Sequence, residues 1–225
     1  ADEPISSREE NMKIIRHVMA SALALLAVML PVGVGAWTIS DAFATAGGDI
    51  IPLLDRNARL DMIDYFNSGM DRPSTNELAG RSSITRMDDR SMRIRLTDAS
   101  NYQLAALPAG ADTLVAVIAT VLTPAPDSRM AVYTRSWDKD LTKNIFKQPV
   151  LSDWLTAEGR RHRDEVAKLV PFMLTAYDYD PATSTLTLSD NSRQCLSEEV
   201  YETVRPYLKE KLVYRWNGKK FTAVK

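Results

Sequence analysis

The sequence predicts an α+β fold in which antiparallel sheet packs against helices on one face, and it leaves open a division into two similar α+β halves. Three patterns support this prediction. Apolar residues recur at helical spacing in 55–70 and 197–208. Between residues 82 and 135 they alternate with polar residues instead, as in half-buried strands. Two turn dipeptides, Asp180-Pro181 and Asn217-Gly218, separate later pairs of strand-like runs.

Two helices are expected before the strands. Ser40 and Asp41 can cap a short helix that ends at Thr45. Asp55 can cap a longer helix that ends near Gly69. The apolar stripe of the longer helix should face the core and comprises Leu60, Ile63, Phe66 and Met70. Polar side chains are expected off this stripe, at Arg59, Asp61 and Asp64.

Four or five antiparallel strands are expected in the alternating region. Alternation is clearest in Met92–Leu96 and Tyr102–Ala106. The run Thr113–Leu122 is apolar almost throughout, which predicts a strand covered on both faces. A turn around Pro124 should lead back into a partner strand at Met130–Arg135.

The second half of the chain begins with helical patterns. Ser152 can cap a helix that reaches Glu158, and Gly159 should interrupt it. A further helix should run from Arg160 and end at Pro171, because proline cannot continue a helix.

Two hairpins and one helix are expected to complete the fold. The first hairpin should turn at Asp180-Pro181. Ser197 can cap the next helix, which should kink or restart at Pro206. Asn217-Gly218 should join the last two strands, at residues 212–216 and 219–224.

Residues 12–36 have the order of a signal peptide. A basic start at Lys13 and Arg16 is followed by a charge-free stretch from Val18 to Ala36. The alternative is a transmembrane anchor, but the apolar run before Pro31 has about 13 residues, whereas spanning a bilayer takes about 20. We therefore expect an exported protein, located in the periplasm, in the cell envelope or outside the cell.

The leader divides the chain into parts. Residues 1–11 precede the first Met and are interpreted as a cloning remnant or an over-extended start. The mature α+β domain is expected at 37–225, with subdomains 37–148 and 149–225 as an open alternative. Once the leader is cleaved, no membrane span is expected.

Charge and composition exclude several classes of function. Without residues 1–36 the chain carries equal numbers of basic and acidic side chains, so it should not attract nucleic acid. The mature part has one histidine, His162, which excludes zinc sites that need two. There is no Gly-rich phosphate loop and no CxxC pair. We therefore expect no cofactor and no metal, and no catalytic residue can be assigned.

The single cysteine, Cys195, cannot form an internal disulfide and is expected to be a buried small side chain, with a reactive thiol as the alternative. His162 lies in the run Arg160–Arg163, which predicts a solvated helix start. The arginines of this run could otherwise hold a phosphate or sulfate.

Acidic residues gather at two places. Asp178 and Asp180 alternate with tyrosines before the expected turn, and Asp190 lies at the other end of the hairpin. These acids are expected to be turn residues rather than calcium ligands, because calcium needs several converging oxygens. Asp55, Asp61 and Asp64 are expected on the solvent side of the long helix.

Aromatic residues are expected mainly in the core. Tyr214 and Trp216 share the strand parity of Leu212, which indicates that they face inward. Three further aromatic residues could belong to the core or line a ligand groove: Tyr133, Trp137 and Trp154.

Three segments carry a family resemblance: Ile51–Met70, Asp127–Tyr133 and Tyr214–Phe221. Together they resemble a family of exported proteins of unknown function from Bacteroides-type (Bacteroidales) bacteria. The resemblance extends from about Ile39 to the end of the chain, and includes the leader. It implies an envelope or secreted α+β protein and brings no catalytic residues.

The leading functional hypothesis is a binding or interaction module of the envelope without catalytic activity, whose partner is an envelope protein or a small ligand. Its binding surface would be the open face of the first sheet, where Arg93 and Arg95 point outward. The alternative is a hydrolase that acts on envelope polymers through paired carboxylates such as Asp178 or Asp180. A third hypothesis is a structural envelope protein with a large apolar patch and stable oligomers.

Overall fold

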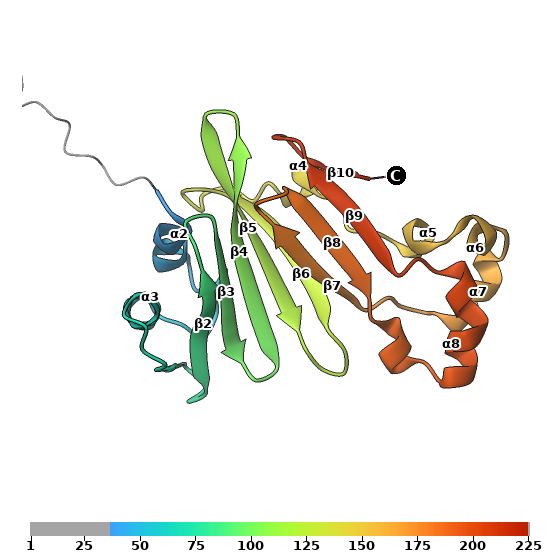
Figure 1. The fold of residues 1–225 in the computed structure, drawn as a ribbon, viewed down its shortest axis with the longest axis horizontal. Coiled ribbons are helices and arrows are strands. Elements are labelled where there is room, and N and C mark those ends of the chain that lie inside the picture. The colour runs from blue at the N-terminus through green and yellow to red at the C-terminus, as the bar shows by residue number, and fades with distance from the viewer. Residues whose placement is uncertain (1–36, 225) are drawn as a thin grey trace, which may run out of the picture. The chain divides into compact units, whose positions relative to one another are not determined.

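The fold contains two antiparallel sheets and several helices, which confirms the predicted α+β class (Figure 1). The computed structural model describes residues 37–224. The expected signal peptide at 12–36 and the segment 1–11 therefore lie outside the described residues. None of the described helices is long and apolar enough to cross a membrane.

The first sheet has six strands that lie side by side in chain order. Its strands are β1 (Ser74–Thr75), β2 (Arg81–Met87), β3 (Ser91–Thr97), β4 (Ser100–Ala109), β5 (Asp112–Val121) and β6 (Asp127–Thr134). Val115, Ala116, Val117 and Ile118 in the middle of β5 are all buried, which confirms a strand covered on both faces.

The second sheet has four strands in the order β10-β9-β8-β7. Its strands are β7 (Thr175–Asp180), β8 (Thr185–Asp190), β9 (Lys211–Trp216) and β10 (Phe221–Ala223). Both expected hairpins are therefore present. In the last one, Gly218 has a φ of 86°, and the Asn217 side chain accepts hydrogen bonds from the N–H groups of Lys219 and Lys220.

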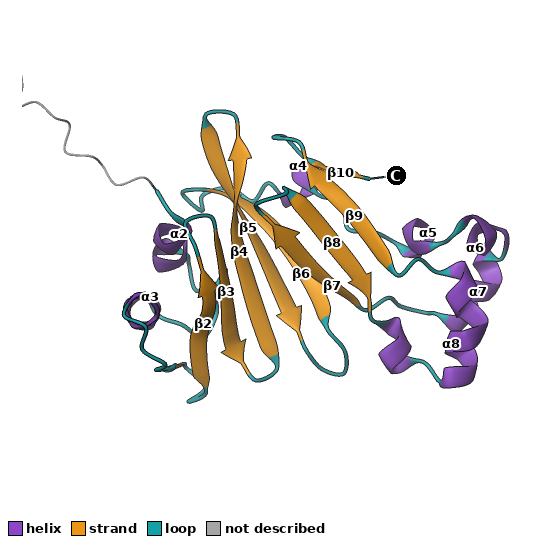
Figure 2. Ribbon diagram, viewed as in Figure 1, coloured by secondary structure: helices purple, strands orange, loops and turns teal. Residues whose placement is uncertain are grey.

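Helices occupy both ends of the arrangement of strands (Figure 2). Beside the first sheet lie α2 (Ile39–Thr45) and α3 (Arg56–Asn67). The remaining helices are short. They are α4 (Thr142–Ile145), which contacts β6, and a group at the other end: α5 (Leu151–Trp154), α6 (Ala157–Arg161), α7 (Arg163–Leu169) and α8 (Glu198–Val204). Two 3₁₀ turns, η1 (Ser192–Cys195) and η2 (Arg205–Tyr207), complete the set, and η2 is the expected restart at Pro206.

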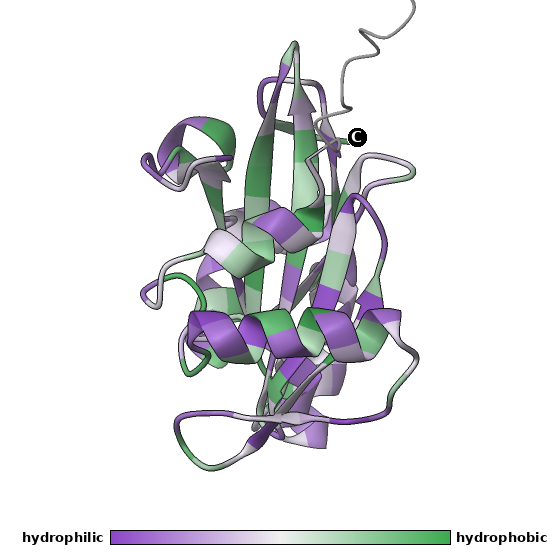
Figure 3. Ribbon diagram, turned by 90° about the vertical axis from the view of Figure 1, so that its left-hand side faces the viewer, coloured by the Kyte–Doolittle hydropathy of each residue, from purple (hydrophilic) through white to green (hydrophobic). Residues whose placement is uncertain are grey.

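The first sheet has different neighbours on its two faces. Figure 3 shows α2 and α3 in front of the sheet, where α2 covers β3 and β4 and α3 lies against β2. On the opposite face, Leu107 and Ile118 pack in a single hydrophobic core with Leu186, Leu188 and Trp216 of the second sheet. This core holds the two sheets together, as expected from their apolar patterns.

The cap of the first helix differs from the prediction, whereas the cap of the second helix agrees with it. The first helix starts after Thr38, whose backbone N–H donates to Asp41 at 2.8 Å, so Ser40 and Asp41 lie inside the helix. The predicted cap Asp55 is confirmed, since its carboxylate accepts from the Ala58 N–H at 2.7 Å.

The inward side of α3 carries Arg59 and Met62, which are 5% and 2% exposed. The prediction that Arg59 lies off the buried stripe was wrong. The helix contacts α2 as well as β2, and these contacts turn the Arg59–Met62 side inward. Leu60, Ile63 and Phe66 are only partly buried, and Met70 lies beyond the end of the helix and is exposed.

Gly159 does not interrupt a helix, contrary to the prediction. It lies inside α6, and the break comes at His162, between α6 and α7. A Cβ atom at Gly159 would lie 2.2 Å from the carbonyl oxygen of Tyr207. The glycine therefore permits close packing of α6 against η2. Ser197 caps α8 as predicted, because its hydroxyl accepts from the Val200 N–H.

Candidate functional site

The candidate site is a pocket where the β2–β3 turn and the β7–β8 turn meet; we call it the junction pocket. It has a volume of about 410 Å³. One wall comes from Arg86 and the turn 88–91, and the other from residues 178–182. Arg93 of β3 and Gln103 of β4 also line it. Both sheets therefore contribute to a single concave surface, and their relative position determines the shape of the pocket.

Gln103 fixes the second sheet to the first at this pocket. Its side-chain Oε1 accepts from the backbone N–H of Tyr179 at 3.1 Å, and its Nε2 donates to the Tyr179 carbonyl at 2.6 Å. Both contacts are buried. The amide thus pairs with β7 as a neighbouring strand would, which satisfies two backbone groups that burial would otherwise leave unpaired.

Two side chains of β6 continue this contact along β7. The Ser128 hydroxyl accepts from the Tyr177 N–H at 3.0 Å, and an Asp127 oxygen accepts from the Thr175 N–H at 3.0 Å. Side chains of the first sheet therefore bind the edge of β7 at every second residue, namely Thr175, Tyr177 and Tyr179. Burial raises the pKa of both Tyr177 and Tyr179, which is consistent with a closely packed strand.

Arg93 and Asp178 form an ion pair across the pocket, between residues 85 apart in the chain. Both side chains are about half exposed, so the pair contributes little to the free energy of folding. Its main effect is local, because each charge neutralises the other where the two sheets approach.

Two other carboxylates of the pocket, those of Asp88 and Asp180, accept hydrogen bonds from groups of their own turns. Partial burial alone would raise the pKa of Asp88, but hydrogen bonds from the Arg90 and Ser91 N–H groups and the Ser91 hydroxyl hold it below its usual value. Hydrogen bonds from the Thr183 hydroxyl and the Ala182 N–H lower the pKa of Asp180. The charge of Arg86 adds a smaller contribution in both cases. These carboxyl groups are therefore ionised at neutral pH.

Three charged side chains of the pocket have neither an ion pair nor a side-chain hydrogen bond among residues 37–224: Arg86, Asp89 and Arg90. All three are exposed. They can reach a ligand without first breaking an existing contact.

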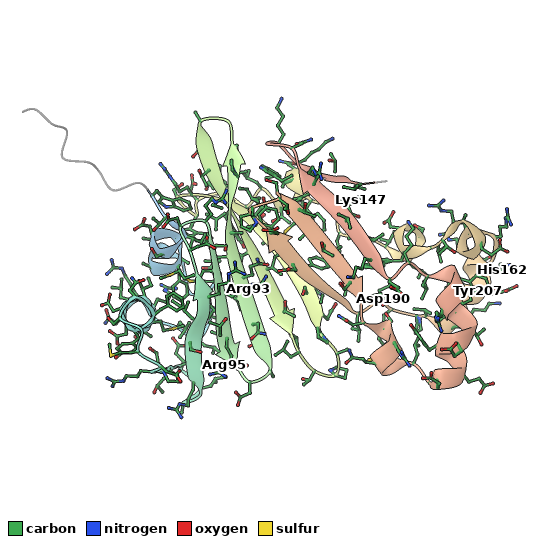
Figure 4. All side chains as sticks on the ribbon, viewed as in Figure 1. Arg93, Arg95, Lys147, His162, Asp190 and Tyr207 are labelled. Atoms are coloured by element: carbon green, nitrogen blue, oxygen red, sulfur yellow. The ribbon has the colours of Figure 1, made fainter. Side chains whose placement is uncertain are left out.

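Of the two arginines that the sequence predicted for a binding surface, only one lines the pocket. Arg93 lines the pocket, whereas Arg95 is exposed further along β3 and is not part of the lining (Figure 4). The prediction that both lie on an open face was wrong for Arg93, because β7 crosses that face and Asp178 pairs with it. A local alternation of polar and apolar residues could not show which strand would cross it.

The sequence-predicted acids also have different outcomes. Asp178 and Asp180 do meet in a concave pocket, together with Asp88 and Asp89. Asp190 lies apart from them, at the other end of the hairpin, as expected (Figure 4). Asp61 and Asp64 are exposed on α3 as predicted. Among the described residues, no three His, Cys, Asp or Glu side chains are arranged to hold a metal ion.

His162 lies between two glutamates and an aromatic ring. Its ring nitrogens are 3.3 Å from Glu158 and 3.1 Å from Glu165, and the ring stacks on Tyr207 at 4.9 Å (Figure 4). The histidine side chain therefore contacts three neighbouring side chains, whereas the sequence predicted a freely solvated residue. Its neighbour Arg161 pairs with Glu158 at 2.7 Å.

Cys195 is exposed, so the prediction of a buried side chain was wrong. It lies in the turn η1, in which the buried residue is Ser192 instead. The hydroxyl of Ser192 accepts from the Leu174 N–H, and the turn is oriented by this contact.

The aromatic residues follow the core prediction in part. Trp154 and Trp216 are buried in the core at 1% and 6% exposure, and Tyr214 packs against it. Tyr133 and Trp137 are half-buried and pack on one another at 5.5 Å, on the side of α2. None of these five residues lines the junction pocket.

Sequence reasoning missed most of the junction pocket: Arg86, Asp88, Asp89, Arg90 and Gln103. The only local signal is the charged turn Met87-Asp-Asp-Arg90 between two alternating runs. Gln103 gives no such signal, since a polar residue on an alternating strand is normally expected to face solvent.

The comparisons with known proteins place the chain in a family. A family model described as "Protein of unknown function (DUF3256)" matches residues 31–221. The chain belongs to this family. The expected membership in a family of unknown function is therefore confirmed. A search among curated proteins finds no match.

One solved structure is similar in fold. It is a domain of an uncharacterized protein from Porphyromonas gingivalis W83, with a TM-score of 0.71 and 21% sequence identity. The similarity covers 83% of this chain and 97% of that one. At this identity the likeness shows a shared fold.

Proposed function

We propose that this chain is an exported binding module of the bacterial envelope, and that the junction pocket holds a small polar ligand. The observation that carries the proposal is the pocket itself, whose two walls come from different sheets that Gln103 fixes together. Preformed concave sites with a few converging polar groups are the usual places for small ligands. Export is proposed from the charge pattern of residues 12–36.

The pKa shifts and the contacts of the pocket carboxylates favour binding over hydrolysis. A general acid that works near neutral pH needs a raised pKa, whereas hydrogen bonds lower the pKa of Asp88 and Asp180. Asp178 is paired with Arg93. The hydrolase hypothesis relied on paired carboxylates such as Asp178 or Asp180 in a concave pocket. Both do line the junction pocket, but Asp178 is engaged by Arg93 and Asp180 by its own turn.

The first experiment tests ligand binding. The purified chain from Thr38 onward would be melted with fractions of the small molecules extracted from the envelope. We expect at least one fraction to raise the melting temperature of the wild type and of Arg95→Ala, but not of Arg86→Ala. Arg95 is the matched control, because it is an exposed arginine outside the pocket.

Two results would overturn the binding proposal. One is that no fraction changes the melting temperature at any concentration up to about 1 mM, the weak end of specific binding. The other is that the ligand is recovered from the protein in a chemically altered form, which would show turnover instead.

The second experiment tests export. Cells that express the whole chain would be fractionated, and the amino terminus of the recovered protein sequenced. We expect a chain that begins at Trp37, in the periplasmic or medium fraction. A chain that stays in the cytoplasm with residues 12–36 attached would contradict this part of the proposal.

A further inference from the structure

The junction pocket contains three arginines and four aspartates, but they are not equally available. Arg93 and Asp178 already pair with one another. Asp88 and Asp180 each accept hydrogen bonds from their own turn. The side chains that are free to bind a ligand are therefore two guanidinium groups, of Arg86 and Arg90, and one carboxylate, of Asp89.

The two arginines suit a carboxylate of the ligand. A guanidinium group presents its N–H donors in a planar fork that matches the two oxygens of a carboxylate. Arg86 is the second-last residue of β2 and Arg90 lies in the turn that follows, so both line the pocket from the same hairpin. Because neither has an ion pair within residues 37–224, a ligand carboxylate would meet unpaired cations.

The acids suit an ammonium group of the same ligand. Asp89 makes no side-chain hydrogen bond among the residues that the structure describes. The carboxylate oxygens of Asp180 each accept one hydrogen bond and keep a further lone pair. A ligand with a negative charge alone would face four carboxylates, and one with a positive charge alone would face three guanidinium groups. A ligand that carries both charges is complementary to the pocket.

Other ligand classes fit the lining less well. The single aromatic residue of the lining is Tyr179, which is 1% exposed and offers no ring face for stacking. The pocket therefore lacks the apolar and aromatic surface that holds apolar ligands. A phosphate group, with up to two negative charges, would be repelled by the surrounding carboxylates.

We infer that the ligand of the junction pocket is a zwitterion of the amino acid or short peptide class, with its carboxylate on Arg86 and Arg90 and its ammonium group on Asp89. The inference rests on the proposed function, because it names the ligand class of the same pocket. It assigns the two ends of the ligand to different side chains of the β2–β3 hairpin.

The test is a calorimetric titration with three probes: trialanine, N-acetyl-trialanine and trialanine amide. The acetylated probe lacks the ammonium group and the amide lacks the carboxylate. We expect trialanine to bind the wild type, and each blocked probe to bind at least about tenfold more weakly, as for the loss of one charge-assisted contact. Inorganic phosphate should not compete.

Variants assign the two ends. The double variant Arg86→Ala with Arg90→Ala should weaken trialanine binding by about tenfold or more, and should leave the weak binding of trialanine amide unchanged. Asp89→Asn should weaken trialanine binding but leave N-acetyl-trialanine unchanged. Arg95→Ala should behave as wild type with every probe. Circular dichroism melts would confirm that each variant is folded.

The outcomes separate the inference from the proposed function. If trialanine and both blocked probes bind equally, or if none binds while an envelope fraction still gives a shift that needs Arg86, the zwitterion inference is overturned and the pocket remains the binding site. If neither the probes nor the envelope fractions give a response that depends on Arg86, both are overturned.

Discussion

The amide of Gln103 binds the backbone of Tyr179 at both its N–H and its carbonyl, across 76 residues of sequence. This contact joins the middle of the first sheet to the edge of the second. Gln103 itself lines the junction pocket, and Tyr179 belongs to the wall at 178–182, so the contact that joins the sheets also holds this wall in place.

Gln103→Ala should lower the free energy of unfolding by about 2–6 kcal/mol, because it leaves two buried backbone groups of Tyr179 unpaired at about 1–3 kcal/mol each. Urea unfolding followed by tryptophan fluorescence would measure the change. Asn101→Ala is the matched control, as Asn101 is an exposed polar residue of the same strand and should change stability by less than about 0.5 kcal/mol. Equal effects of the two variants would contradict the prediction.

Gly159→Ala should destabilise the protein, although alanine normally stabilises a helix relative to glycine. The new methyl group would overlap the Tyr207 carbonyl oxygen, so α6 and η2 would have to separate. We expect a loss of about 1–3 kcal/mol, typical of overpacking. Gly48→Ala, with open space around the added atom, should leave the melting temperature unchanged or slightly raised. A stable Gly159→Ala variant would show that the two segments can move apart easily.

Asp88→Ala should make the protein less stable at pH 7, and the effect should shrink as the pH falls below about 4. The pKa of Asp88 is lower in the folded protein than the value of about 3.9 in an unfolded chain. Its contribution is therefore present above about pH 4 and is lost as the pH falls through the folded pKa. Because the carboxylate is largely exposed, we expect about 1 kcal/mol or less at pH 7. The control is Asp98→Ala, in the neighbouring β3–β4 turn, and urea unfolding at several pH values would show whether the two differ.

Arg59→Met should raise the free energy of unfolding by about 1–2 kcal/mol. The Nε and Nη1 atoms of Arg59 are buried and have no hydrogen-bond partner in the described part of the chain, and burial lowers the pKa of the guanidinium group. Methionine keeps much of the volume and removes the unpaired polar atoms. Arg56→Met, at an exposed position of the same helix, should have little effect. A loss of stability at Arg59 beyond about 1 kcal/mol would show that the guanidinium group makes a stabilising contact.

Cys195 should react fully with a maleimide in native buffer, because its side chain is exposed in η1. We expect one label per chain, added as quickly without urea as with it. Mass spectrometry at successive times would measure the reaction. Labelling that needs denaturant would restore the sequence-based expectation of a buried thiol.

Local patterns were sufficient for most elements of the fold. The alternation in Met92–Leu96 placed β3, and the Asn217-Gly218 turn placed the last hairpin, because backbone geometry and turn chemistry depend on nearby residues. The prediction for Gly159 was wrong because the role of this residue depends on Tyr207, which is distant in sequence. Arg59 was misjudged because the direction that faces the core is set by packing against α2 and β2.

The candidate site was harder to predict for the same reason. Asp178 and Arg93 are both polar residues of alternating strands, but no residue near either one in the sequence indicates that they meet. Their pairing depends on how the second sheet crosses the first, and this crossing is fixed by Gln103 and Ser128. A single sequence carries no direct sign of such long-range contacts.

The edge of β7 is covered by side chains of the first sheet, and this affects how the protein behaves at high concentration. The exposed backbone groups of an edge strand can pair with a strand of another chain, which is a route to fibrils. Here side chains of the first sheet bind the edge of β7. The edge of β6 is covered by residues 139–142, through backbone hydrogen bonds of Leu141 with Val132 and of Lys139 with Thr134. The outer strands that remain, β1 and β10, have two and three residues and make poor templates. The architecture itself thus opposes self-assembly, a useful property for a protein in a crowded compartment.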